Sequence, residues 1–212
     1  YGWTQGPNGE TGVSEVKSYP NISVGQPPGF ASTGHPNLPK KVGEIDVLWA
    51  GFKSKATGLT SGFGHLSMDM RLMTTNQDFG NGNGGYAVAK DYIRVELFVV
   101  IEQYGGYGSH PNGRASSRYR GLHTIGGVDW HVYIQPGASE KPGGGPNPQL
   151  IWLPATLPCP NPINLAPLFK WAAATKYNQL ANGAGSIFEY NKGANDYIID
   201  SNQWFVSNAI GV

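Results

Sequence analysis

The segment from Tyr92 to Tyr104 limits the folds open to this 212-residue chain more than any other, because its apolar residues alternate like those of a β-strand. Successive side chains of a strand point to opposite faces of its sheet. One face of this segment is an uninterrupted apolar stripe: Ile93, Val95, Leu97, Val99 and Ile101. The other face carries Tyr92, Arg94, Glu96, Phe98 and Val100. The segment therefore predicts a long strand that turns one face to the core.

The rest of the chain consists of shorter strand-like segments separated by turn residues. The sequence holds 31 Gly and 16 Pro, together with 6 Trp, 11 Tyr and 8 Phe, which suits short strands and tight turns in a folded chain. We expect further strands at residues 13–18, 45–52, 64–75, 119–125, 128–135, 150–153, 187–190, 197–200 and 204–207. One helix is expected after Asn164, which can cap it, with Pro167 in its first turn.

This pattern predicts an all-β fold, a β-sandwich of jelly-roll type with a single α-helix, in one domain over residues 1–212. The formal net charge of +1 gives no electrostatic reason to expect nucleic acid or an anionic membrane as a partner. Arg114, Arg118 and Arg120 are interpreted as part of a solvated loop. The single cysteine, Cys159, is expected to be a buried small side chain rather than a nucleophile.

Three acidic residues stand in apolar or strand-like surroundings. Glu96 lies mid-strand, where a half-exposed cross-strand ion pair is the simpler interpretation. Asp69 shares a strand face with Ser67 and Arg71, and beside the Glu96 strand it could share or orient a proton on Glu96. Glu189 stands alone among large apolar residues, and such burial favours a general acid.

These motifs, taken in order, resemble glycoside hydrolase family 12. The tract Glu96-Leu97-Phe98-Val99-Val100-Ile101, followed by Gln103-Tyr104-Gly105-Gly106, is similar to the family's nucleophile strand, with Phe98 nearest to the family's methionine. Phe188-Glu189 resembles its acid/base segment. Gly127, Trp130 and Tyr133 match a Gly-x-x-Trp-x-x-Tyr strand, and Met68-Asp69-Met70 matches the strand whose aspartate assists the nucleophile. Tyr1-Gly2-Trp3-Thr4 and 16–21 match early segments of the family.

The resemblance implies a secreted, retaining glycosidase that cleaves β-1,4-glucan or xyloglucan in a concave cleft. Glu96 would be the nucleophile, Glu189 the general acid/base and Asp69 the assisting carboxylate. Trp3, Phe98, Trp130 and Tyr104 would contact the sugar, although core positions remain open for Trp3 and are favoured for Trp130. The family has strands before the one that carries Trp3, so we expect such strands to precede this sequence.

No metal or other cofactor is expected. The five histidines are scattered, and His123 and His131, which could face each other across a hairpin, are interpreted as structural. Two alternatives stay open: a non-catalytic glycan-binding or cell-surface assembly protein on the same sandwich, and a polysaccharide lyase. The partner expected of the glycosidase is its polysaccharide substrate, and the sequence leaves the oligomeric state undetermined.

Overall fold

The fold is that of a computed structural model, which describes residues 21–51, 63–80, 88, 92–105, 118–135, 148–181 and 195–211. Its strands are β1 (Asn21–Gly25), β2 (Lys40–Lys41), β3 (Trp49–Ala50), β4 (Phe63–Met73), β5 (Ile93–Gly105), β6 (Tyr119–Ile125), β7 (Val128–Gln135), β8 (Gln149–Pro154), β9 (Ile163–Asn164) and β10 (Trp204–Gly211). The α-helix with described bounds is α2 (Ala166–Ala174), and two 3-10 turns are η1 (Val42–Glu44) and η2 (Tyr177–Gln179).

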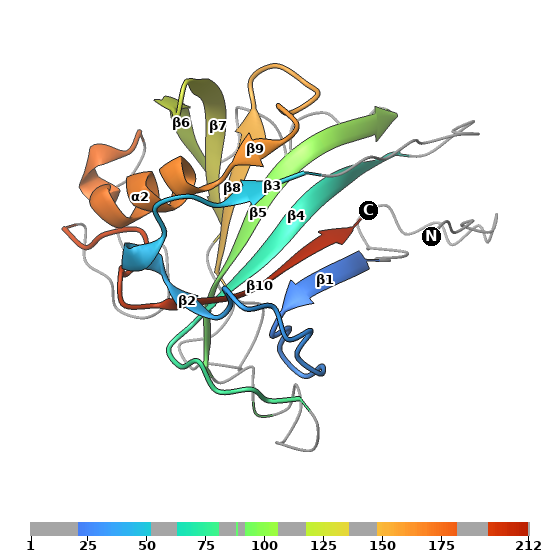
Figure 1. Ribbon diagram of the computed structural model, residues 1–212. Helices are drawn as coiled ribbons and strands as arrows, with labels where there is room; N and C mark the ends of the chain where they lie inside the picture. The colour runs from blue at the N-terminus through green and yellow to red at the C-terminus, as the bar shows by residue number, and fades with distance from the viewer. Residues whose placement is uncertain are drawn as a thin grey trace.

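One large twisted sheet dominates the molecule (Figure 1). Its strand order is β1-β10-β4-β5-β8-β7-β6, with β2 paired to β10 at one end. The β5–β8 pair is parallel, whereas the other pairs of this sheet are antiparallel. A second, two-stranded sheet is formed by β3 and β9. The predicted class, an all-β sandwich of jelly-roll type, is confirmed.

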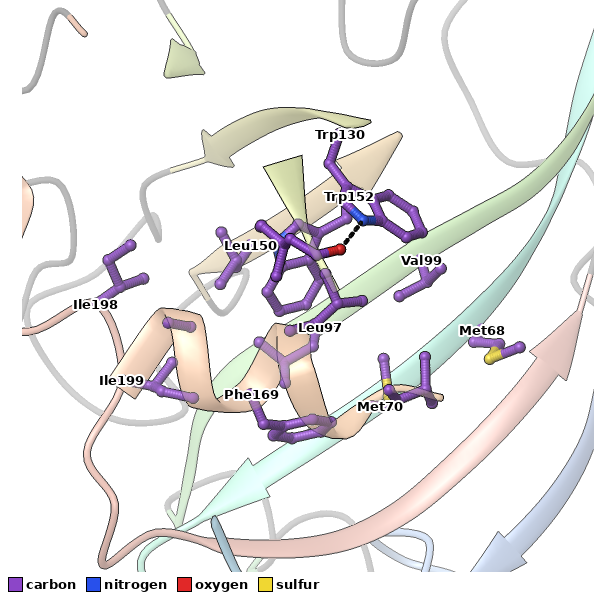
Figure 2. Packing of buried hydrophobic residues seen from close by; sticks show 14 of the residues in the cluster. Met68, Met70, Leu97, Val99, Trp130, Leu150, Trp152, Phe169, Ile198 and Ile199 are labelled. Carbon is purple, nitrogen blue, oxygen red and sulfur yellow. Dashed lines mark hydrogen bonds between the residues drawn. The ribbon is translucent and has the colours of Figure 1, made fainter. Parts of the chain in front are cut away.

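The main core lies between one face of the large sheet and the layer that holds α2 and β9 (Figure 2). Met70, Leu97 and Trp152 point from neighbouring strands into this core, and each is fully buried. Phe169 of α2 packs against Phe205 of β10, with ring centroids 5.3 Å apart. Four residues of the apolar stripe predicted for β5 belong to this core: Val95, Leu97, Val99 and Ile101. Ile93 does not, because the β4–β5 register is irregular beyond Val95, and Ile93 packs instead in a separate buried cluster with Met73.

The opposite face of the large sheet is also apolar at its centre. Val100, Tyr133, Ile151 and Leu153 form a second buried cluster there, and Phe98 and Tyr119 pack against it. A sheet with both faces buried restricts strand register, because a slip by one residue would exchange the two sets of side chains.

The β6–β7 hairpin has the bounds predicted from the sequence. Gly126 and Gly127 form its turn with φ of 62° and 81°, as the favoured two-residue hairpin turn requires. A Cβ on Gly126 would come within 2.9 Å of the Pro167 side chain, so the hairpin end packs tightly against the start of α2.

Asn164, which was expected to cap α2, lies one residue before the capping position. Its Oδ1 accepts hydrogen bonds from the backbone N–H groups of Ala166 and Leu48, each at 3.1 Å, while Leu165 holds the capping position itself. The side chain therefore joins the helix start to the segment that leads into β3.

Several sequence predictions of local structure were wrong. The segment 45–52 forms a strand only at Trp49–Ala50. At 197–200 only Tyr197 makes an isolated bridge, because Ile198 and Ile199 are both buried instead of alternating. Arg120 is buried within β6 instead of lying in a solvated loop, and burial lowers its pKa. The predicted strands at 13–18 and 187–190, and Arg114, lie outside the described residues.

None of the helices in the described ranges is long and apolar enough to cross a membrane.

Replacing Leu97 with Ala should lower the free energy of unfolding by about 2–5 kcal/mol, because a fully buried side chain in a central strand leaves a cavity. Urea denaturation followed by tryptophan fluorescence measures the change. The matched control is Leu122→Ala on β6, where the side chain is 52% exposed, and its effect should stay within about 0.5 kcal/mol. Equal losses in the two variants would contradict this core assignment.

Candidate active site

The strand register brings polar residues of four neighbouring strands into one row across the large sheet. Arg71 of β4 pairs with Glu96 of β5, and Glu96 pairs in turn with Gln149 of β8. Ser207 of β10 continues the row beyond Arg71. Alternation places these side chains on the face opposite α2, since their neighbours Leu72, Leu97 and Leu150 belong to the main core.

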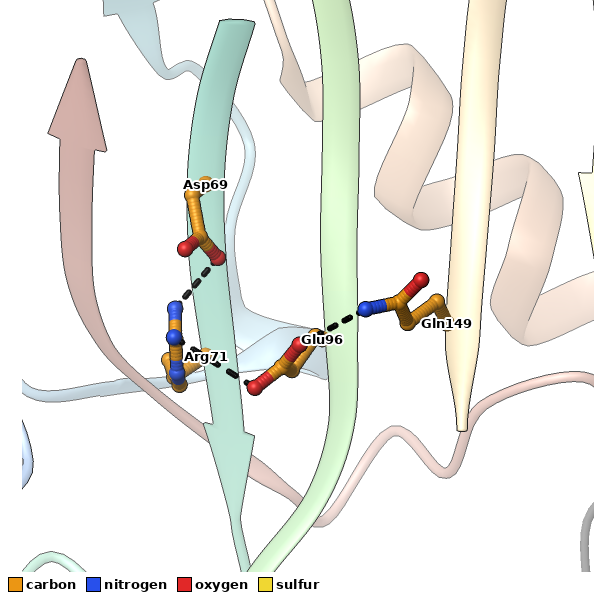
Figure 3. Close-up of polar contacts among 4 residues, drawn as sticks. All are labelled: Asp69, Arg71, Glu96 and Gln149. Carbon is orange, nitrogen blue, oxygen red and sulfur yellow. Dashed lines mark hydrogen bonds and ion pairs between the residues drawn. The ribbon is translucent and has the colours of Figure 1, made fainter. Parts of the chain in front are cut away.

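The two carboxylate oxygens of Glu96 are held from the two sides (Figure 3). Arg71 Nη2 lies 3.3 Å from Glu96 Oε1, and Gln149 Nε2 donates a hydrogen bond of 3.1 Å to Glu96 Oε2. The Glu96 side chain is 12% exposed, so its charge is shielded from most of the solvent. One charged and one neutral donor therefore fix the plane of this carboxylate.

Asp69 joins the same group through Arg71. Arg71 Nη1 forms an ion pair with Asp69 Oδ1, and the Asp69 side chain is only 4% exposed. Asp69 is opposite Phe98 in the register, so it sits diagonally across from Glu96 on the same face. The structure thus places the Met68-Asp69-Met70 strand beside the Glu96 strand, the arrangement that the sequence argument required, with a guanidinium contacting both acids.

An apolar row lies next to this polar row. It contains Phe98, Ile151 and Tyr133, which are register partners on β5, β8 and β7. Tyr119 packs on Tyr133 with ring centroids 5.2 Å apart. Phe98 is therefore on the face of the sheet that carries Glu96, beside aromatic neighbours.

Trp130 does not belong to this face, and its prediction as a sugar-contacting residue was wrong. It is 1% exposed in the main core, where its indole N–H donates to the Ile125 carbonyl oxygen at 3.3 Å (Figure 2). The even number of residues between Trp130 and Tyr133 puts them on opposite faces of β7, so a ligand on the Glu96 face is separated from Trp130 by the sheet.

The side chains of three other predicted site residues are not described by the structure. Glu189 and Trp3 lie outside the described residues, and Tyr104 is described only as backbone in β5, where it pairs with Gly64. Sequence reasoning in turn missed Gln149 and the part played by Arg71. Their contribution depends on which strands are neighbours, although the Ser67-Asp69-Arg71 alternation already put Arg71 on the right face.

The two histidines of the β6–β7 hairpin face opposite sides. His131 Nδ1 lies 3.1 Å from the Tyr119 hydroxyl, whereas His123 packs against Trp171 of the helix layer, with the two rings tilted by 56°. No group of three or more His, Cys, Asp or Glu side chains among the described residues is arranged to bind a metal ion.

The architecture is similar to that of several solved glycosidases. A metagenome-derived glycoside hydrolase family 12 endoglucanase aligns with 93% of this chain and 66% of its own, at 17% identity and a TM-score of 0.58. A family 12 xyloglucanase from Bacillus licheniformis aligns with 95% of this chain and 69% of its own, at 15% identity and a TM-score of 0.57. The fold is that of family 12 glycoside hydrolases.

An endoglucanase from Rhodothermus marinus gives a comparable alignment, with 18% identity, a TM-score of 0.56, and coverage of 93% of this chain and 67% of its own. The chain thus spans about two thirds of the length of these family 12 enzymes. No protein-family model and no curated protein sequence matches it. The structural likeness confirms the predicted resemblance at the level of the fold.

Cys159 is not available as a nucleophile. It is 4% exposed, and burial raises the pKa of its thiol to about 12. A thiol with a raised pKa stays protonated and unreactive at neutral pH. This position confirms the expectation of a buried small side chain.

Ellman's reagent at pH 8 should therefore label the folded protein far more slowly than the urea-unfolded chain. The same shift makes the protein lose stability as the pH rises from about 9 towards about 12, because the unfolded thiol ionises first. Denaturation midpoints measured across this range, with Cys159→Ala as the control, isolate the thiol's share. Rapid stoichiometric labelling of the folded protein would contradict the burial.

Proposed function

We propose that the protein is a retaining, endo-acting glycoside hydrolase that cleaves β-1,4-linked glucan or xyloglucan by double displacement. The observation that carries the proposal is the Glu96 carboxylate, held through both oxygens on one face of the sheet, in a fold shared with solved endoglucanases and a xyloglucanase. A nucleophile must be fixed in direction before attack, and Arg71 and Gln149 supply the donors that hold the Glu96 carboxylate.

Glu96 is the nucleophile in this proposal and Glu189 the general acid/base. Glu96 attacks the anomeric carbon while Glu189 gives its proton to the leaving oxygen. Water, deprotonated by Glu189, then releases the sugar and restores the Glu96 carboxylate. Double displacement requires the two carboxyl groups to lie about 5–5.5 Å apart.

The sugar would lie over the face that carries Glu96. Phe98 is the described aromatic residue proposed to contact it, and Trp3 and Tyr104 are proposed to extend that surface. Asp69 is proposed to assist Glu96. The substrate is a neutral polysaccharide, the enzyme is secreted, and residues 1–212 form a single domain of it.

Glu96→Gln should lower the release of reducing ends from xyloglucan, mixed-linkage β-glucan and carboxymethylcellulose by at least about a thousandfold, because an amide cannot act as the nucleophile. The matched control is Glu102→Gln, which removes a carboxylate from the same strand, six residues away, and should leave the rate within about twofold.

Glucan hydrolysis that persists in Glu96→Gln would refute the assigned role. A wild-type protein that binds these polysaccharides and releases no reducing ends would identify a glycan-binding protein instead. Products that absorb as unsaturated sugars would identify a lyase.

A further inference from the structure

Arg71 is shared between two carboxylates in a poorly solvated place. Its Nη1 contacts Asp69 and its Nη2 contacts Glu96, while the side chains of Asp69, Glu96 and Arg71 are 4%, 12% and 21% exposed. Ion pairs with so little solvent contact are screened less than surface pairs, so the charge balance within the group matters. This triad comprises two anions and one cation, with a net charge of −1.

We propose that Arg71 is a positioning residue whose charge is balanced by two carboxylates before the reaction and by Asp69 alone in the covalent intermediate. In the free enzyme it holds Glu96 Oε1 and Asp69 together, and once Glu96 is esterified its charge is balanced by Asp69 alone. Asp69 then assists the nucleophile through Arg71. This inference rests on the proposed function, because it states which carboxylate balances the Arg71 charge before and after Glu96 is esterified in the double displacement.

The net charge of the triad changes as the bond between Glu96 and the sugar forms and breaks. When Glu96 forms the ester bond to the anomeric carbon, the glycosidic C–O bond breaks and the leaving oxygen takes a proton from the general acid. The carboxylate loses its negative charge, and the triad passes from −1 to 0, with Arg71 and Asp69 left as a neutral pair. Hydrolysis of the ester by water returns the charge to Glu96 and the triad to −1.

Without Asp69 the covalent intermediate would contain a shielded guanidinium that neither acid of the triad balances. Such a charge is costly, because its desolvation is no longer offset by an anion of the triad. The net charge of −1 also favours the cationic, oxocarbenium-like transition state that glycoside hydrolysis passes through. Asp69 therefore contributes to both the transition state and the intermediate.

Other polar groups around Glu96 leave this argument in place. Gln149 on β8 is a neutral donor, and Ser207 on β10 is a neutral partner of Arg71 in the register. Arg94 lies two residues before Glu96 in β5, at the irregularity where Leu72 pairs with Val95 and Met73 pairs with Ile93. Of the described charged residues, Asp69 and Arg71 come from β4, the strand that pairs with this part of β5.

A double-mutant cycle on the free energy of unfolding tests, without any substrate, whether Asp69 and Glu96 share Arg71. Glu96→Gln imitates the uncharged, esterified Glu96, and Asp69→Asn removes the other anion with little change of shape. Each single variant leaves Arg71 one carboxylate of the triad, so each loss of unfolding free energy should be small. The double variant removes both, and its loss should exceed the sum of the single losses. Urea denaturation measures all four proteins.

The control cycle combines Asp69→Asn with Asp46→Asn. Asp46 pairs with the exposed Lys170, away from the triad, so these two losses should add. Adding Arg71→Gln to the Asp69→Asn/Glu96→Gln protein should recover part of its stability, because it removes a cation that has lost both anions of the triad. Additive losses in the Asp69–Glu96 cycle, or no recovery with Arg71→Gln, would overturn the sharing.

Kinetics give a second readout that a purely structural role of Asp69 would not produce. Asp69→Asn should lower kcat for an aryl cellobioside by at least about tenfold, which corresponds to ~1.4 kcal/mol of transition-state stabilisation, and leave KM within about twofold. An unchanged kcat in the folded variant would contradict the inference. If the wild-type protein hydrolyses no glucan, the proposed function fails, while the stability cycle still decides whether Arg71 is shared.

Discussion

The register of β5 between β4 and β8 is the constraint on which the rest of the structure depends. The strand is buried on both faces, with Leu97 in the main core and Val100 in the second cluster. A slip by one residue would put the Glu96 carboxylate into the main core and Leu97 in the polar row, at a large desolvation cost. Packing of two apolar clusters therefore holds one acidic side chain in place without a contribution from that side chain itself.

The proposed function depends on a few polar side chains on a sheet that is otherwise apolar. Arg71, Glu96 and Gln149 are neighbours only because an antiparallel pair and a parallel pair share β5. A guanidinium on one side and an amide on the other give Glu96 a direction, and Asp69 balances the guanidinium. The rigid sheet therefore preorganises Glu96, since its hydrogen-bond donors need no rearrangement before attack.

The sequence was informative wherever local pattern decides structure. The bounds of the β6–β7 hairpin were predicted correctly, because the alternating strand pattern is interrupted by two consecutive glycines. Glycines readily adopt the positive φ that the favoured two-residue hairpin turn requires at both positions. The sequence pattern did not predict the short strands β1, β2 and β9. These strands form by pairing with segments that are distant in the sequence, β10 for β1 and β2, and β3 for β9. Trp130 was misplaced in function for a related reason: alternation shows that Trp130 and Tyr133 face opposite ways, but not which face carries the ligand. The pairing of Arg71 with Glu96 likewise depends on strand order, which alternation does not encode.

The central claim is that Glu96 becomes covalently bonded to the sugar. An activated 2-deoxy-2-fluoro cellobioside slows the release of a glycosyl-enzyme, so that the adduct of a retaining enzyme accumulates. Mass spectrometry of the intact protein and of its proteolytic peptides then locates the added sugar. We expect one fluorosugar per chain, on the peptide that contains Glu96, and none in Glu96→Gln. A label on another residue, or glucan hydrolysis with no trapped adduct, would contradict it.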